Sequence, residues 1–297
     1  MIISGLLGSV SSITHELTTS DALLRSPLAL SRRIGFVQLR GGSGASATAG
    51  YVASMLARRR TGMVLGVNAS AGETNMLWQA GLTRSAAGAS RLGGASDQNR
   101  RLHPSSAADA RAGLPMTGSG LIALDLARDH LAPSAGTWFE QVTPIARFYD
   151  LVITDWGVRH WQVDLRQVAR ASHVVCLVAR ADRYPAEEAA ALIPALAEVE
   201  DQPRVVLALA DVGGTAERTP QLLQSQLQVP VISIPYDTRR AHARPVASRQ
   251  LPSSSRLAYT RLCTALMAEA VKPTTYRRLV APDLGESQSP VAGGGRS

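Results

Sequence analysis

A glycine-rich turn at residues 40–47 is the part of this chain whose residue types and spacing could do chemistry. It lies between a short apolar run and a helix-like segment. Glycines let backbone N–H groups converge, and with the N-terminus of a helix these groups can bind a phosphate. The residues of this predicted cradle are Arg40, Gly41, Gly42, Ser43, Gly44, Ala45, Ser46 and Ala47.

The turn lacks the cation that a working phosphate-binding loop carries. Such loops end in Gly-Lys-Ser or Gly-Lys-Thr, and the lysine reaches the β- and γ-phosphates. Ala45 stands at that position, and the single lysine of the chain, Lys272, lies near the C-terminus. A charge-assisted contact is worth about 1.5–3 kcal/mol, so its loss should weaken binding by about tenfold to a hundredfold. Hydrolysis should suffer more, because it depends most on electrostatic stabilisation.

Asp155, after the apolar run at residues 151–154, is the second candidate for this chemistry. A carboxylate at the end of a buried strand beside a phosphate loop is where a magnesium-associated aspartate belongs. Ser46 stands where a magnesium-binding hydroxyl would be, although a serine there also caps helices well. We therefore name Ser46 and Asp155 as candidate Mg²⁺ residues, and Asp155 and Arg40 as the only catalytic candidates. A surface aspartate that closes a strand stays open as the alternative for Asp155.

Short apolar runs alternate with helix-like segments along residues 32–272, and these elements must position the candidate residues. The expected strands are residues 34–39, 63–67, 121–126, 151–154, 174–179, 205–210 and 231–234, and the expected helices are 46–60, 138–149, 185–199 and 257–271. This order predicts an α/β fold, a three-layer sandwich in which helices flank a mainly parallel sheet on both faces. Ligands of such sheets bind beyond the C-terminal strand ends, where the turn and Asp155 both fall.

Three segments are expected to lie outside this pattern. Residues 1–31 are expected to form a partly disordered leader with at most one short amphipathic helix. Residues 80–118, rich in Gly, Ala, Ser and Arg, are expected to form a long loop insertion of low order. Residues 273–297 are expected to form a disordered tail.

Bulk composition limits the class of protein. The 297 residues carry a formal net charge of +8, and 45% are hydrophobic, which suits a large core. No apolar run approaches the ~18 residues of a membrane span. Cys176 and Cys263 have no spaced partner, which predicts no disulfide or metal site and favours a cytoplasmic protein. Arginine clusters at 58–60, 239–240 and 277–278 could bind nucleic acid, but the arginine bias of the whole chain makes this partner not favoured.

Five segments, in order, resemble the MinD/ParA superfamily over residues 33–270. Residues 40–47 resemble its deviant phosphate loop (deviant Walker A), Lys-Gly-Gly-x-Gly-Lys-Thr-Thr. The other segments, residues 64–70, 149–157, 171–182 and 231–237, resemble its second strand, its Tyr-Asp-x-hydrophobic-Asp strand, the strand after that, and its Ile-Pro-x-Asp segment. This resemblance implies a P-loop NTPase-like domain, ATP and Mg²⁺ as cofactors, and a homodimer.

Departures from the family pattern argue against an efficient ATPase. The signature lysine that crosses the sandwich dimer corresponds to Arg40, and the loop lysine corresponds to Ala45. The paired aspartates after the second strand correspond to Asn68 and Ser70, so only Asp155 remains among the acidic positions. An alanine for the loop lysine also resembles the pilus-localisation and septum-site branch (TadZ/CpaE/Ssd-like).

The resemblance and these losses together predict a pseudo-ATPase that positions or recruits machinery for cell division, pilus assembly or secretion. ATP and Mg²⁺ binding is expected to be weak or absent. Recruitment to membrane-associated machinery would go through a protein partner, because residues 273–297 resemble no amphipathic anchor. Two alternatives stay open. One is an active ATPase in chromosome or plasmid partitioning, with Arg40 as compensating cation, and the other is a non-nucleotide scaffold or regulatory subunit of a type VII-like secretion locus.

Overall fold

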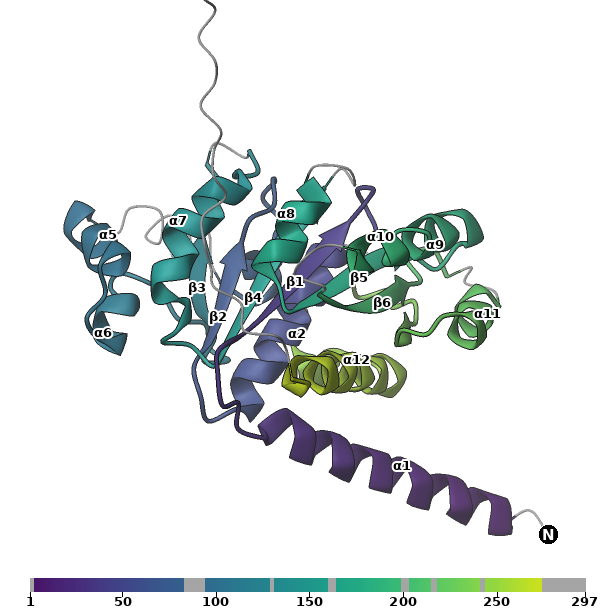
Figure 1. Ribbon diagram of the computed structural model, residues 1–297. Coiled ribbons are helices and arrows are strands. Elements are labelled where there is room, and N and C mark those ends of the chain that lie inside the picture. The colour runs from purple at the N-terminus through teal and green to yellow at the C-terminus, as the bar shows by residue number, and fades with distance from the viewer. Residues whose placement is uncertain are drawn as a thin grey trace, which may run out of the picture.

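The structure is a computed structural model that describes residues 3–82, 94–128, 131–159, 164–198, 203–214, 218–240 and 244–273, with side chains from residue 12 onward. A seven-stranded sheet forms its centre (Figure 1). The strands are β1 (Arg32–Gln38), β2 (Val64–Asn68), β3 (Ile122–Asp125), β4 (Leu151–Val158), β5 (Val174–Arg180), β6 (Arg204–Ala210) and β7 (Val231–Ile234). They lie in the order β3-β2-β4-β1-β5-β6-β7, and each pairing is parallel. The expected α/β fold is confirmed.

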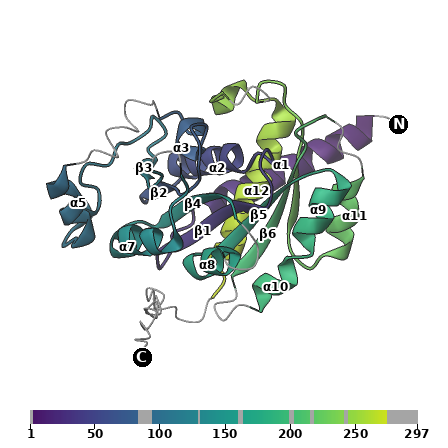
Figure 2. The same ribbon diagram turned by 90° about the horizontal axis from the view of Figure 1, so that it is seen from above.

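Helices cover both faces of this sheet (Figure 2). The described helices are α1 (Ile3–Arg25), α2 (Ala45–Arg59), α3 (Met76–Gln79), α5 (Ala95–Leu102), α6 (Ala107–Ala110), α7 (Ala135–Ala146), α8 (Asp164–Ala171), α9 (Arg183–Ala190), α10 (Ile193–Ala197), α11 (Thr219–Gln226) and α12 (Ser253–Val271). Residues of α2, α3 and α12 share one apolar core around Phe36 and Tyr259. Residues from α7 through α11 share the other, around Trp138 and Trp156. Because each face is covered, the strands are apolar along most of their length.

The structure differs from the sequence expectation at β4, at the helix expected over residues 185–199, and at α8 and α11. Strand β4 continues to Val158, so Asp155 lies within the strand instead of after its end. The helix expected over residues 185–199 is divided into α9 and α10, with Pro194 in the first turn of α10, where a missing N–H is tolerated. Helices α8 and α11 form where the sequence pattern predicted no element.

Residues 3–25 form one long helix, whereas at most a short one was expected in the leader. Helix α1 contacts α12 and α2, and Arg261 pairs with Glu16 through hydrogen bonds of 2.6 and 2.9 Å. Arg59 of α2 pairs with Asp21 at 2.8 Å, and Leu24 is completely buried. The C-terminal half of α1 therefore packs against α2 and α12.

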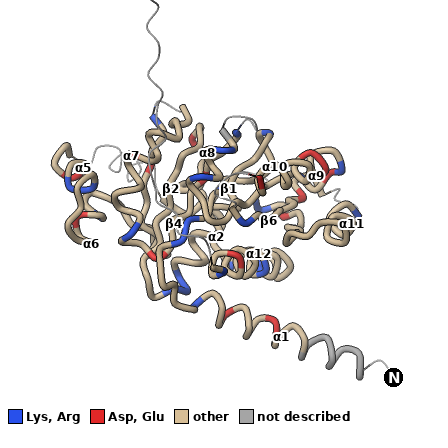
Figure 3. The backbone as a smooth tube through the Cα atoms, viewed as in Figure 1, with Lys and Arg blue, Asp and Glu red and all other residues tan. Residues whose placement is uncertain are grey.

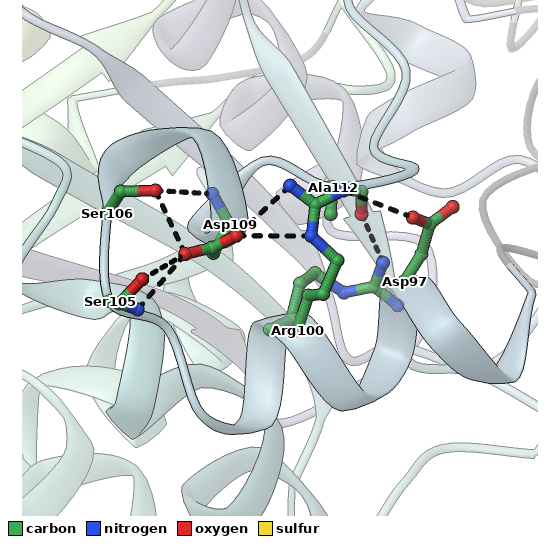
Figure 4. A network of polar contacts seen from close by, with 7 residues as sticks. Asp97, Arg100, Ser105, Ser106, Asp109 and Ala112 are labelled. Carbon is green, nitrogen blue, oxygen red and sulfur yellow. Dashed lines mark hydrogen bonds and ion pairs between the residues drawn. The ribbon is translucent and has the colours of Figure 1, made fainter.

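Residues 94–118 are also more ordered than the sequence pattern predicted, since they contain α5 and α6 (Figure 4). The hydroxyl groups of Ser105 and Ser106 and the guanidinium of Arg100 donate to Asp109, and these contacts hold the pKa of its carboxyl well below the usual value. Tyr149 donates to the Ala110 carbonyl at 2.9 Å, which ties this segment to the sheet. Residues 83–93 of the expected insertion, and residues 274–297 of the expected tail, lie outside the described residues.

Basic and acidic residues are interspersed along the backbone (Figure 3). Arg58, Arg59 and Arg60 donate to a hydroxyl, a carboxylate and a backbone carbonyl of neighbouring elements, respectively. Arg240 lies over the Tyr259 ring at 4.7 Å, and the pair at 277–278 lies outside the described residues. Among the described arginines of these clusters, Arg58, Arg59, Arg60 and Arg240 therefore contact other parts of the fold, whereas Arg239 is exposed. Within the described helices, none combines the length and apolar character that a membrane crossing requires.

Candidate functional site

The turn between β1 and α2 places the predicted phosphate cradle beyond the carboxyl end of a central strand. Gly42 and Gly44 both have φ of +79°, the left-handed region that disfavours residues with a Cβ. Ser43 donates its hydroxyl to the Arg40 carbonyl at 3.0 Å, and Thr48 N–H donates to the Gly44 carbonyl at 2.9 Å. Because α2 begins directly after this turn, the unpaired N–H groups of its first turn lie at the cradle.

Alanine variants at two neighbouring glycines test this backbone requirement. A Cβ added at Gly41 or Gly42 would meet no atom within 4 Å, so only the positive φ of Gly42 separates them. We expect Gly42→Ala to lower the free energy of unfolding by about 1–2 kcal/mol in urea denaturation, because a Cβ is unfavourable in the left-handed region. Gly41→Ala should not lower the free energy of unfolding, because the alanine also restricts the conformations of the unfolded chain. Equal losses in both variants would contradict the conformation described for the turn.

A cavity of about 570 Å³ opens along the carboxyl edge of the sheet at this turn. Gly44 and Ser46 line its middle, at β1. Tyr236, in the segment after β7, lines one end, and Thr74, in the segment after β2, lines the other. The strand order puts β7 and β2 on opposite sides of β1, so the cavity crosses most of the sheet edge. The cavity is therefore elongated along this edge, with the turn at its middle.

Charged groups gather at the β7 end of the cavity. Asp237 is 8% exposed, and one of its carboxylate oxygens accepts from the Arg239 N–H at 3.0 Å. Burial lowers the pKa of Arg240 to about 10, although the Asp237 charge opposes this shift. Asp211 accepts from the N–H groups of the two glycines that follow it, at 3.2 and 2.6 Å. Among the described residues that line the cavity, Arg240 is the one cation.

Asp155 is completely buried next to the turn. Its carboxylate accepts from the Gly157 N–H at 3.0 Å and from the Ser70 hydroxyl at 3.2 Å, and also from the Ser46 hydroxyl and the Met76 N–H. Burial raises the pKa of Asp155 above its usual value, while these hydrogen bonds act in the opposite direction. Ser46 and Asp155 therefore lie together, with the hydroxyl of Ser46 donating to the carboxylate of Asp155.

Asn68 and Ser70 join Asp155 to a second carboxylate. The Asn68 amide donates to Asp125 at 2.8 Å and accepts from the N–H and hydroxyl of Ser70, at 3.1 and 2.8 Å. Neutral groups thus form an internal hydrogen-bond network at the positions where the resemblance implies paired aspartates. Asp125, at the end of β3, was missed in the sequence analysis, although it ends an apolar run much as Asp155 does.

These residues do not fit a magnesium ion. Mg²⁺ takes oxygen ligands in a nearly octahedral arrangement, and it usually keeps several waters and binds through one or two carboxylates together with substrate phosphates. Asp155 is sealed from the cavity and already accepts from at least four donors, so of the predicted pair only Ser46 lines the cavity. Over the described ranges, His, Cys, Asp and Glu form no group of three that could hold a metal ion.

Arg40 extends away from the cradle, toward α9. Its guanidinium donates to both carboxylate oxygens of Glu188, at 2.8 and 3.0 Å, and to the Tyr184 hydroxyl at 3.3 Å. The hydrogen bonds with Glu188 raise the pKa of Arg40 and lower that of Glu188. Arg40 does not line the cavity, so its position does not favour the role of compensating cation. Nothing in the sequence pattern pointed to Glu188, because the contact joins residues 148 positions apart.

Comparisons with known proteins identify the fold. No protein-family model and no curated protein matches the sequence. Among solved structures, the cell division ATPase MinD of Pyrococcus furiosus has a TM-score of 0.61 at 18% identity, covering 80% of this chain and 99% of that one. MinD of Pyrococcus horikoshii, in complex with Mg-ADP, has a TM-score of 0.58 at 18% identity, covering 78% and 94%.

A third neighbour, a ParA family ATPase of Chlorobium tepidum, has a TM-score of 0.54 at 21% identity and covers 82% of this chain and 96% of that one. At sequence identities this low, the structural likeness establishes the shared fold alone. Any activity must be argued from the residues of the site. The sheet order, the turn between β1 and α2 and these likenesses agree: the chain has the MinD/ParA-like P-loop fold.

Proposed function

We propose that this chain is a degenerate MinD/ParA-like protein that holds a nucleotide in its cavity and acts by recruitment, with ATP hydrolysis weak or absent. The observation that carries the proposal is a phosphate cradle made of backbone without a cation in it. Gly42 and Gly44 shape the turn, Ala45 replaces the loop lysine, and Arg40 is paired with Glu188. Backbone N–H groups can bind phosphate by themselves, whereas phosphoryl transfer depends on positioned cations.

The proposed partner is a machine for cell division, pilus assembly or secretion, and the proposed assembly is a homodimer in the cytoplasm that reaches membrane-associated machinery through that partner. A solved structure that supports a protein partner is the MinC:MinD cell division protein complex of Aquifex aeolicus, with a TM-score of 0.56 at 17% identity. Recruitment does not require turnover, because a ligand that orders a surface can support binding there without being consumed.

Binding and single-turnover assays on the purified full chain test this proposal. We expect calorimetric heat on titration with adenine nucleotides, and no phosphate release during hours with enzyme in excess over ATP. Magnesium-dependent hydrolysis would replace the proposal with an active partitioning-type ATPase. No heat at millimolar nucleotide would replace it with a scaffold that keeps only the fold.

A further inference from the structure

The cavity gives a bound nucleotide a direction along the sheet edge. Its β7 end offers an aromatic ring and buried polar groups, from Tyr236, Asp237 and Arg240, which suit a base and sugar. Its β2 end is formed by smaller neutral residues, among them Ala71 and Thr74. With the nucleoside toward β7, the first phosphates meet the backbone cradle at β1, and any further phosphate extends toward β2.

A third phosphate would find no positive charge at the β2 end. The residues that line the cavity there include Ala71, Thr74 and Gln79, and Gln38 lines it at the end of β1; all four are neutral. Behind this wall lie the carboxylates of Asp155 and Asp125, joined by the network through Asn68. Ala45 contributes no charge. An added phosphate would therefore bring negative charge to a place where the described residues are either neutral or acidic.

The one cation of the loop is held elsewhere. The backbone of Arg40 belongs to the turn. Its guanidinium, however, already donates hydrogen bonds to Glu188 and Tyr184 on α9. A guanidinium and a carboxylate joined by two parallel hydrogen bonds form a geometrically specific contact. For Arg40 to meet a terminal phosphate, this contact must first break.

We infer that the site prefers a nucleoside diphosphate to a triphosphate and binds it without magnesium, and that Glu188 strengthens this preference by holding Arg40 on α9. The inference rests on the proposed function, because it takes the nucleotide to bind in this cavity. Two phosphates suit a cradle of backbone N–H groups, whereas a third adds charge without a partner. Missing one charge-assisted contact corresponds to about tenfold or more in affinity. The exposed ion pair between Arg40 and Glu188 accounts for a smaller part of the preference for the diphosphate, about two- to fivefold in affinity.

Calorimetry with AMP, ADP and ATP on the full chain, each in EDTA and in excess Mg²⁺, tests the preference. We expect ADP to bind at least tenfold more tightly than ATP, with affinities that magnesium leaves unchanged. ATP binding as tightly as ADP, or binding that EDTA abolishes, would overturn the inference while the proposed function survives. Absence of heat with all three nucleotides would overturn the proposed function and the inference with it.

A matched pair of variants on α9 tests the role of Glu188. Glu188→Gln should improve ATP affinity about two- to fivefold and leave ADP affinity unchanged, because it releases Arg40. Glu187→Gln removes the same charge from the neighbouring residue, which pairs with Arg183 at 2.8 Å on its own helix, and should change neither affinity. An unchanged ADP-to-ATP ratio in Glu188→Gln, or an equal change in both variants, would show that Glu188 has no part in the preference.

Discussion

Replacing Asp155 by alanine should lower the free energy of unfolding by about 3–5 kcal/mol, because each buried donor that loses its acceptor costs about 1–3 kcal/mol. The carboxylate is completely buried, and its removal leaves the Ser46 hydroxyl and the Gly157 and Met76 N–H groups without this acceptor, while the Ser70 hydroxyl keeps its contact with Asn68. Chemical denaturation monitored by circular dichroism measures this loss. Asp155→Asn keeps the size and one acceptor oxygen, so we expect it to lose less than the alanine variant.

Asp182→Ala is the control for this experiment. Asp182 precedes α9, makes no side-chain cap hydrogen bond, and pairs with Arg180 on the surface at 2.7 Å. Exposed ion pairs contribute little, so this variant should change the free energy of unfolding by less than about 1 kcal/mol. If Asp155→Ala cost no more than Asp182→Ala, the buried network would contribute nothing to stability.

Asp155 should also give stability a pH dependence opposite to that of a salt-bridged aspartate. Burial raises its pKa above the ordinary value of 3.8, so the folded protein keeps this proton at pH values where the unfolded chain has lost it. Its contribution is therefore fully present below pH 3.8 and is lost as pH rises through the raised folded pKa. Asp155→Asn cannot titrate, so the free energy of unfolding of the wild type, minus that of this variant, should fall across that window. A difference independent of pH would contradict the raised pKa.

Ala45→Lys should raise the affinity for nucleoside triphosphates by about tenfold to a hundredfold. Ala45 lines the cavity at the first residue of α2, so a lysine there adds a cation to a cradle whose backbone is already shaped. Calorimetry with a non-hydrolysable ATP analogue measures the change. Hydrolysis should not rise with it, because Asn68 and Ser70 remain neutral.

Thr61→Lys controls for the added net charge, because Thr61 is exposed and lies just beyond the opposite end of α2. At physiological ionic strength its charge should be largely screened from the cavity and change affinity less than about twofold. Equal gains in both variants would mean that overall charge, and not the position in the loop, controls binding.

The sequence by itself determined the α/β architecture, because strands buried on both faces must be apolar along their length and glycines must stand where φ is positive. It also determined the neighbourhood of the turn and Asp155, since carboxyl ends of parallel strands share one edge of a sheet. The sequence pattern did not predict helices α8 and α11. They are short, and packing against the sheet supplies most of the stability of such helices.

Only the tertiary structure decided what the charged groups do. Arg40 could equally have faced a phosphate by its place in the loop, but α9 brings Glu188 to it from 148 residues away. Asp155 reads as a metal-side carboxylate, yet the folded chain surrounds it with donors and joins it through Asn68 to Asp125. The electrostatic role of a charged group depends on its burial and on its distance from residues remote in sequence. A local sequence pattern contains neither kind of information.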